Sequence, residues 1–347
     1  MQHINIHKDF KLNGKTFGTS NALIHYVENN LTEHSRFVKE IFNDQNFIIA
    51  HTSGSTGTPK EIKILKKYLI NSAKNTIDYF NLVPKTTALL NLSSDFIAGK
   101  MMWVRALIGG WYLDVISPEN KAIAKQLQNK KYDFGAMVPL QAYENIGYLN
   151  HISQLIIGGG SVSDELLQKL QKLSNKCFAT YGMTETVTHI AVKLLNGSDA
   201  NNSYQVLKDI KIDIDSRNCL IIDAPKLSDK KVITNDLVTL VDNNHFVWLG
   251  RFDNIINSGG VKIIPEQVEK KLSGIINTPF FISSFPDQKL GEKLVIFIEG
   301  KEKPISFENL NRFEKPKQVI FIEQFDRTNS GKIIRKQIQT NYLKSLE

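Results

Sequence analysis

The sequence has few cysteines, no long apolar run and no internal repeat. Its two cysteines, Cys177 and Cys219, cannot build a disulfide framework and do not have the spacing of metal ligands. No apolar run approaches the roughly 18 to 20 residues that cross a bilayer, and the first eight residues lack the hydrophobic core of a signal peptide. We therefore expect a cytoplasmic protein without membrane insertion.

The chain also lacks a concentrated basic patch, although its net charge is +8. The basic residues are dispersed, often as pairs such as Lys66–Lys67 and Lys270–Lys271. No cluster is interleaved with aromatic residues as a base-stacking surface would be. We expect solvated surface charge and no nucleic-acid partner. A positive surface would still steer small polyanions toward the protein.

Length and hydrophobic pattern predict an α/β protein of two domains. The 347 residues are enough for a sizeable core, and the 41% apolar and 22% charged shares are those of a globular protein. Between about residues 45 and 173, short apolar segments alternate with helical patterns, which predicts a largely parallel sheet. Short alternating segments from 210 to 249 predict a smaller antiparallel region. A small α+β domain follows the Gly-rich, polar segment 250–262, which is typical of a domain boundary.

A loop of hydroxyls and glycines follows the apolar segment 47–50. Its glycines allow close approach to a phosphate, its N–H groups and hydroxyls can donate to phosphate oxygens, and its lysine adds a charge. A flexible linker is the alternative, but linkers are not usually flanked by apolar strands. The spacing is not that of a Walker A loop, because Thr58 and Pro59 separate the last glycine from the lysine. The candidate phosphate-binding residues are Thr52, Ser53, Gly54, Ser55, Thr56, Gly57 and Lys60.

Two further loops carry candidate ligand-binding residues. Glycines 158–160 follow the apolar segment 155–157, and ligands bind beyond the carboxyl ends of parallel strands. We expect both glycine-rich loops, 54–57 and 158–160, at that edge. In the segment 181–186, Thr184 and Glu185 place a hydroxyl beside a carboxylate, which suits phosphate and Mg²⁺. A surface turn with a capping threonine is the alternative there.

These loops, in this order, resemble the motifs of the adenylate-forming superfamily of acyl-CoA synthetases, adenylation domains and luciferases. The resemblance covers residues 47 to about 336. It implies that the 52–60 loop holds the phosphates of ATP and that Thr184 and Glu185 serve the α-phosphate, with Glu185 also on Mg²⁺. It further implies an adenine site built from Gly158, Gly159, Gly160, Tyr181 and Gly182.

The same resemblance gives roles to residues of the second half. It implies that Asp236 and Arg251 bind the ribose and that Lys332 is the adenylation lysine. It places a hinge at Asp253, between a shortened N-terminal domain, 1–252, and a mobile C-terminal domain, 253–347. The segment implied to line the tunnel for the pantetheine arm of coenzyme A contains Gly259, Gly260 and Lys262.

Within the superfamily the chain resembles o-succinylbenzoate–CoA ligases of menaquinone synthesis, on segments 96–99, 102–105 and 138–141. That implies a dicarboxylic acid substrate, with Phe96 and Gly99 in the acyl pocket and Arg105 or Lys100 on the distal carboxylate. The two cations are five residues apart on one predicted helix, so their side chains point about 140° away from each other around its axis. At most one of them should therefore meet the distal carboxylate. The alternative is that both are ordinary surface cations.

The chain departs from the superfamily pattern in its C-terminal turn and in its length. Asp326 stands where a proline usually precedes the arginine at 327. Only about 50 residues precede the phosphate loop, fewer than is common in the superfamily. We expect the ATP chemistry to be intact and the acyl pocket and any dimer surface to differ from the family pattern.

The implied reaction is an ATP-dependent ligation of a carboxylic acid to coenzyme A through an acyl-adenylate. Two alternatives share the nucleotide motifs: a generic aryl- or fatty-acyl-CoA ligase, and a carrier-protein-dependent adenylation enzyme. A non-catalytic nucleotide-binding module is disfavoured, since the candidate catalytic and ribose residues are all present. The sequence makes no prediction of oligomeric state.

Overall fold

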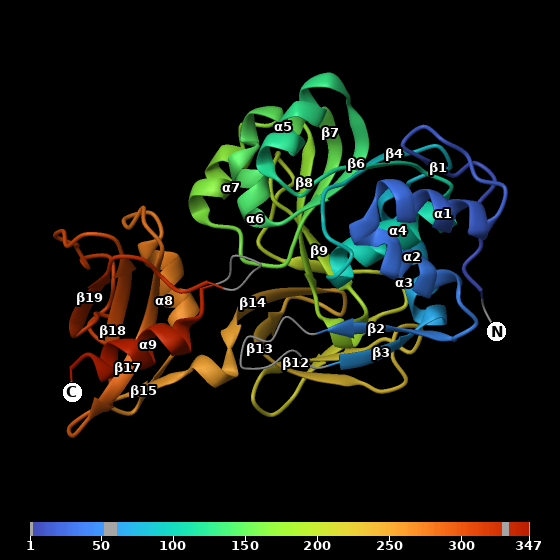
Figure 1. Cartoon of the computed structure of the whole chain (residues 1–347). Coiled ribbons are helices and arrows are strands. Elements are labelled where there is room, and N and C mark those ends of the chain that lie inside the picture. Colours follow the sequence, from blue (N-terminus) through green and yellow to red (C-terminus); the bar gives the residue numbers. More distant parts are fainter. Residues whose placement is uncertain (1–2, 52–60, 328–332, 347) are drawn as a thin grey trace.

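The computed structural model describes residues 3–51, 61–327 and 333–346, and its largest feature is a twelve-stranded mixed sheet (Figure 1). The strand order is β1–β5–β4–β6–β7–β8–β9–β10–β14–β13–β12–β11. The first six of these pair in parallel. They are β1 (Lys11–Leu12), β5 (Tyr112–Val115), β4 (Thr87–Leu90), β6 (Tyr132–Met137), β7 (Ile152–Ile157) and β8 (Lys176–Gly182).

The other six strands pair in antiparallel fashion. They therefore continue the parallel sheet instead of forming a layer of their own, since β9 pairs directly with β8. They are β9 (His189–Leu194), β10 (Tyr204–Val206), β14 (His245–Arg251), β13 (Val232–Leu240), β12 (Cys219–Asp223) and β11 (Lys211–Ile214).

Helices cover both faces of the parallel half. They are needed on both because successive strand residues point to opposite faces and are apolar on each. In β4, Ala88 and Leu90 belong to one apolar core and the intervening Leu89 to another. The first core contains α1 (Ser20–Asn30), α2 (Thr32–Phe42), α3 (Lys66–Phe80) and α4 (Ile97–Gly109). The second contains α5 (Asn120–Asn129), α6 (Pro139–Glu144), η1 (Ile146–His151) and α7 (Asp164–Leu170). The predicted α/β class is confirmed.

The strands beside the phosphate loop are the main departure from the predicted topology. β2 (Phe47–His51) and β3 (Glu61–Leu65) pair with each other in antiparallel fashion and form a separate two-stranded sheet. The expectation that residues 54–57 follow a strand of the parallel sheet is therefore wrong. Residues 52–60 themselves lie outside the described part of the chain.

The last quarter of the chain, from Ile256 on, forms a second sheet with its own apolar cores. The order is β16–β15–β18–β17, and β19 pairs with β18 in parallel. These two cores contain no residue before Ile256, and Figure 1 shows this part, in orange and red, beside the large sheet. The elements are β15 (Ile256–Ser258), β16 (Val261–Ile263), α8 (Pro265–Leu272), β17 (Phe280–Asp287), β18 (Gly291–Glu299), β19 (Gln318–Ile322) and α9 (Arg335–Lys344).

Two helices begin where local sequence predicts. The Ser163 side chain accepts a hydrogen bond from the N–H of Leu166 at the start of α7, and Pro265 is the first residue of α8. None of the helices in the described ranges is long and apolar enough to cross a bilayer.

Candidate active site

Tyr181 and Asp236 form the centre of the candidate nucleotide site. Tyr181 lies near the end of β8, and its hydroxyl donates a 2.7 Å hydrogen bond to Oδ2 of Asp236 on β13. The other carboxylate oxygen accepts from the indole N–H of Trp248 at 3.2 Å. Burial, and then the charge of Asp236, raises the pKa of Tyr181, so the phenol remains a neutral donor. These bonds orient the carboxylate that the resemblance assigns to the ribose.

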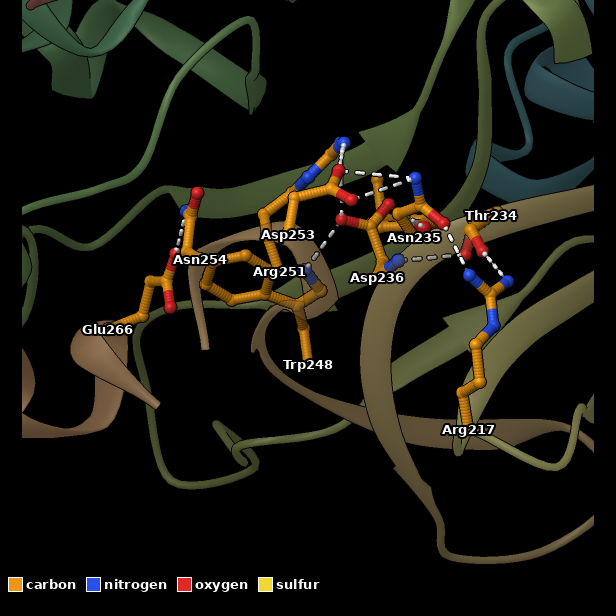
Figure 2. A network of polar contacts seen from close by, with 10 residues as sticks. Arg217, Thr234, Asn235, Asp236, Trp248, Arg251, Asp253, Asn254 and Glu266 are labelled. Atoms are coloured by element: carbon orange, nitrogen blue, oxygen red, sulfur yellow. Dashed lines mark hydrogen bonds and ion pairs between the residues drawn. The ribbon is translucent and has the colours of Figure 1, made fainter. Parts of the chain in front are cut away.

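Arg251 and Asp253 extend this arrangement toward the second sheet, as Figure 2 shows. Arg251 is the register partner of Asp236, and its Nη1 lies 3.7 Å from Oδ1 of that carboxylate. Its Nη2 donates at 3.1 Å to Asp253, in the short helix η3 (Phe252–Asn254). Asp253 also accepts from the amide of Asn235 at 3.1 Å. The proposed ribose residues and the proposed hinge residue are therefore parts of one hydrogen-bonded network.

Two side-chain hydrogen bonds between described residues link α8 and the residue after it to the part of the chain that forms the first sheet. The amide of Gln267 donates to the carbonyl of Leu249 on β14 at 2.5 Å. The Ser273 hydroxyl donates to Asp164, at the start of α7. Polar contacts of this kind are compatible with the mobile C-terminal domain proposed for 253–347.

Thr184 and Glu185 lie in the short helix η2 (Thr184–Thr186), directly after β8. The Glu185 side chain is exposed and makes no hydrogen bond or ion pair with another described residue. The described ranges hold no group of three or more His, Cys, Asp or Glu side chains suited to a metal. One free carboxylate fits Mg²⁺, which binds few protein carboxylates and takes phosphate and water oxygens for its other ligands.

The glycines assigned to the adenine site and the coenzyme A tunnel lie in two separate turns. Residues 158–160 directly follow β7, next to the strand that carries Tyr181, as predicted for a loop at the carboxyl edge of the sheet. Gly259 and Gly260 form the two-residue turn between β15 and β16, with φ of +58° and +80°. Two residues in this left-handed region favour glycine. Lys262 is exposed on β16.

The two candidate acyl-site cations have different surroundings. Lys100 on α4 lies over the ring of Phe37 at 4.5 Å, and its Nζ is 4.0 Å from Glu40, so both neighbours come from α2. Burial lowers the pKa of the Lys100 ammonium, which Glu40 partly offsets. Lys100 is therefore already occupied by this carboxylate and this ring.

Arg105, on the same helix, is 1% exposed and contacts only neutral groups. Its Nε donates to Thr76 at 3.2 Å, and Nη2 lies 3.5 Å from both Thr188 Oγ1 and His189 Nδ1. No carboxylate of the described residues lies within 4.0 Å of it. Burial lowers the pKa of the guanidinium to about 9, which leaves it charged at neutral pH. The alternative, that both are ordinary surface cations, is wrong, because both side chains are buried.

The remaining acyl-site candidates lie at the start of α4. Phe96 precedes the helix and is 44% exposed. Gly99 packs against the chain before it: a Cβ there would lie 2.2 Å from the carbonyl oxygen of Ser93. The 52–60 loop and Lys332 lie outside the described residues, so their proposed roles are not placed on the structure.

Sequence reasoning missed the side chains that orient the named ones. The sequence pattern indicates only a strand residue at Trp248, but its indole N–H reaches Asp236. The pattern itself gives no sign of a role for Thr76, Thr188 or His189. The position of Thr188 and His189 shortly after Glu185 was the only local signal for the last two.

Comparison with known proteins places the chain in a family. Residues 12–215, more than half of the chain, match the model of the AMP-binding enzyme family. A 2-succinylbenzoate–CoA ligase of Lactococcus lactis is 23% identical over 318 residues, covering 84% of this chain and 70% of that protein. One of Listeria monocytogenes is 25% identical over 330 residues, covering 85% and 70%.

Two solved structures share the fold. A protein of Dyadobacter fermentans, described as similar to acyl-CoA synthetase (AMP-forming)/AMP-acid ligase II, superposes with a TM-score of 0.60 at 34% identity, covering 89% of this chain and 93% of that one. An o-succinylbenzoate coenzyme A synthetase of Bacillus subtilis, in complex with ATP and magnesium ion, gives 0.73 at 18% identity, covering 94% and 83%. The predicted resemblance is confirmed, and the chain belongs to the AMP-binding enzyme family.

Proposed function

We propose that the protein is an AMP-forming acid–CoA ligase whose acid substrate is 2-succinylbenzoate. Membership of the AMP-binding enzyme family supports the adenylate chemistry. The names of the curated relatives, 22–25% identical over most of the chain, support the choice of acid. ATP and coenzyme A are then the other two substrates, and Mg²⁺ is the metal ion.

The observation that carries the choice of a dicarboxylate is the environment of Arg105. A fully buried guanidinium without a carboxylate partner is costly, because its charge has lost water and gained no opposite charge. The second carboxylate of the acid would supply that charge, and the planar fork of arginine grips carboxylates in a bidentate manner. Lys100 does not compete for this role, since Glu40 already pairs with it.

The first step forms the acyl-adenylate. A carboxylate oxygen of the acid attacks the α-phosphorus of ATP, and pyrophosphate leaves. Such transfers depend on positioning and charge neutralisation more than on covalent protein chemistry. Asp236 and Arg251 hold the ribose, the 52–60 loop holds the β- and γ-phosphates, and Lys332 bridges the carboxylate and α-phosphate oxygens. Glu185 would hold Mg²⁺, which neutralises phosphate charge when bound.

The second step transfers the acyl group to coenzyme A. Its thiol attacks the acyl carbonyl of the adenylate, and AMP leaves. For this step, part 253–347 rotates about Asp253, which withdraws Lys332 and brings the Gly259–Gly260 turn to the thiol path. The bonds from Asp253 to Asn235 and Arg251 must then rearrange. Movements of this kind often limit turnover.

A pyrophosphate-release screen tests the function. The purified protein receives ATP, Mg²⁺ and one acid at a time: 2-succinylbenzoate, benzoate or a medium-chain fatty acid. Mass spectrometry then follows the product with coenzyme A or with a phosphopantetheinyl carrier protein as acceptor. We expect 2-succinylbenzoyl-CoA as the preferred product. Preference for a monocarboxylate, or for the carrier protein, would replace this proposal with one of the two alternative ligase classes.

A further inference from the structure

Three polar residues contact the guanidinium of Arg105 in a buried cluster made from separate elements. Thr76 comes from α3, Arg105 from α4, Thr188 from the link after η2, and His189 from the first position of β9. Thr76 and His189 are 0% and 5% exposed. Among the described residues, those proposed to bind the nucleotide make none of these contacts.

The hydrogen bonds of the cluster determine which nitrogen of His189 carries the proton. Arginine can only donate, so Nδ1 of His189, 3.5 Å from Arg105 Nη2, must accept. Nε2 therefore carries the proton and donates to Thr76 Oγ1 at 3.3 Å. The Thr76 hydroxyl in turn donates to the carbonyl of Ser72 at 3.2 Å. Every donor in this chain of bonds has one acceptor, and the imidazole is neutral.

Burial is consistent with this neutral form. It lowers the pKa of His189 well below its usual value, and the charge of Arg105 lowers it further. The cluster thus holds a single positive charge, on Arg105. By contrast, the arginines at 327 and 335 each form a two-bond ion pair, with Glu299 and Glu269 respectively. Neutral partners orient the Arg105 guanidinium without cancelling its charge.

An unusual backbone conformation brings His189 to this place. Val187 has φ +68° and ψ −57°, and the N–H of Thr188 donates to the carbonyl of Thr186 at 2.8 Å. This is a tight three-residue turn, which is rare and strained, above all for a β-branched residue. It redirects the chain between Glu185, the proposed Mg²⁺ ligand, and His189 of the Arg105 cluster. Strain of this kind concentrates at functional sites.

We propose that His189 is a positioning residue that holds the Arg105 fork, as a neutral acceptor, in the direction that receives the second carboxylate of the acid. The inference has two halves. The substrate half, in which His189 orients Arg105 toward the acid, rests on the proposed function. The geometric half, the neutral imidazole with its proton on Nε2, stands without any substrate.

The geometric half is tested by NMR on the whole protein. With ¹⁵N-labelled histidine, long-range ¹H–¹⁵N spectra distinguish the two neutral tautomers and the imidazolium, and loss of one signal in His189→Gln assigns the residue. We expect His189 to carry its proton on Nε2 throughout the range from about pH 6 to 8. A proton on Nδ1, or an imidazolium near neutral pH, overturns the inference whatever the substrate.

The substrate half is tested by comparing His189→Leu, His189→Gln and a control, His34→Leu. His34 is a buried histidine of the same domain that accepts from Trp103 and does not contact Arg105. We expect His189→Leu to raise KM for 2-succinylbenzoate relative to benzoate by roughly 3- to 10-fold, as for the loss of one hydrogen bond, with kcat less affected. His189→Gln, whose amide can accept and donate in the same places, should restore most of that ratio.

The outcomes separate the two proposals. Equal loss on both acids, or the same change of ratio in His34→Leu, overturns the positioning role of His189 while the function stands. A parent protein that uses no dicarboxylate overturns the proposed function, and with it the substrate half of this inference. In that case the NMR result still decides the geometric half.

Discussion

The hydroxyl of Tyr181 donates to the carboxylate of Asp236 over a separation of 55 residues and across three intervening strands of the sheet. Strands so far apart in the order can meet only because the sheet curves and brings β13 back over the end of β8. The rings of Tyr181, Tyr204 and Phe246, from β8, β10 and β14, pack against one another between these two strands. The candidate nucleotide site is thus built where the parallel and antiparallel halves of the sheet meet.

Substitution of Asp236 should weaken nucleotide binding through the ribose. Its carboxylate is proposed to accept from both ribose hydroxyls, and hydrogen bonds to a charged group contribute about 1.5–3 kcal/mol. Asp236→Ala should raise KM for ATP roughly 10- to 100-fold, and KM for 2′-deoxy-ATP by a smaller factor, because one hydroxyl is already missing. Asp242→Ala, an exposed aspartate of the β13–β14 turn that pairs with His245, serves as the control. Equal effects on both nucleotides would disprove the ribose assignment.

Lys332 should be needed for one half-reaction only. Lys332→Ala should bind ATP but lose most acyl-adenylate formation, since the removed charge would stabilise the transferring phosphoryl group by about 3–4 kcal/mol. Thioester formation from supplied acyl-adenylate should largely survive. Lys336→Ala, at an exposed position on α9, should affect neither step. If both half-reactions fall together in Lys332→Ala, the two-conformation mechanism is wrong.

Arg105 should determine the preference for a dicarboxylate. We expect Arg105→Leu to weaken use of 2-succinylbenzoate by about 100-fold, equivalent to about 3 kcal/mol for the loss of a charged hydrogen-bonding partner. Use of benzoate should change little. Because the guanidinium also bridges Thr76, Thr188 and His189, the unfolding midpoint must be measured in parallel. A uniform loss on both acids would reduce Arg105 to a structural role.

The ion pair between Glu299 and Arg327 should make stability depend on pH. Both oxygens of Glu299 accept from the guanidinium at 2.7 Å, and these bonds hold the pKa of Glu299 below its usual value. A carboxylate with a lowered folded-state pKa contributes stability above its unfolded value near 4.3, and loses it as pH falls through the folded value.

Glu299→Gln should therefore unfold more easily than the parent at pH 7, by roughly 1–2 kcal/mol in urea. The difference should shrink as pH falls through the lowered folded-state pKa of Glu299 and vanish in stronger acid, where the carboxyl is protonated in both states. Glu302→Gln, at an exposed position three residues along the chain, is the control and should match the parent. A difference that persists in acid would show that the carboxylate charge is not the cause.

Gly99 should tolerate no side chain. A Cβ there would meet the backbone carbonyl of Ser93 at 2.2 Å, and backbone atoms cannot move aside as a flexible side chain can. Gly99→Ala should cost at least about 1–3 kcal/mol of unfolding free energy, the usual range for overpacking. Gly147→Ala has no atom within 4 Å of the new Cβ and should be neutral or slightly stabilising. Equal unfolding midpoints would contradict the close approach of α4 to residue 93.

Local sequence was sufficient for the features that depend on neighbours in the chain. The alternation of apolar segments predicted the strands and helices of the parallel half, because periodicity reports which face of an element is buried. Ser163 and Pro265 marked helix starts for the same local reason, since each satisfies or avoids a backbone donor of the first turn. The order of the loops was enough to indicate the family.

Only the tertiary structure decided which side chains meet. Lys100 and Arg105 are both cations of one helix, yet one pairs with Glu40 and the other has only neutral partners. Trp248 and Tyr181 converge on Asp236, and β2 pairs with β3 outside the parallel sheet. These outcomes depend on strand order, register and helix packing between residues far apart in the chain. Hydrophobic periodicity determines which face of an element is buried, and packing determines what that face touches.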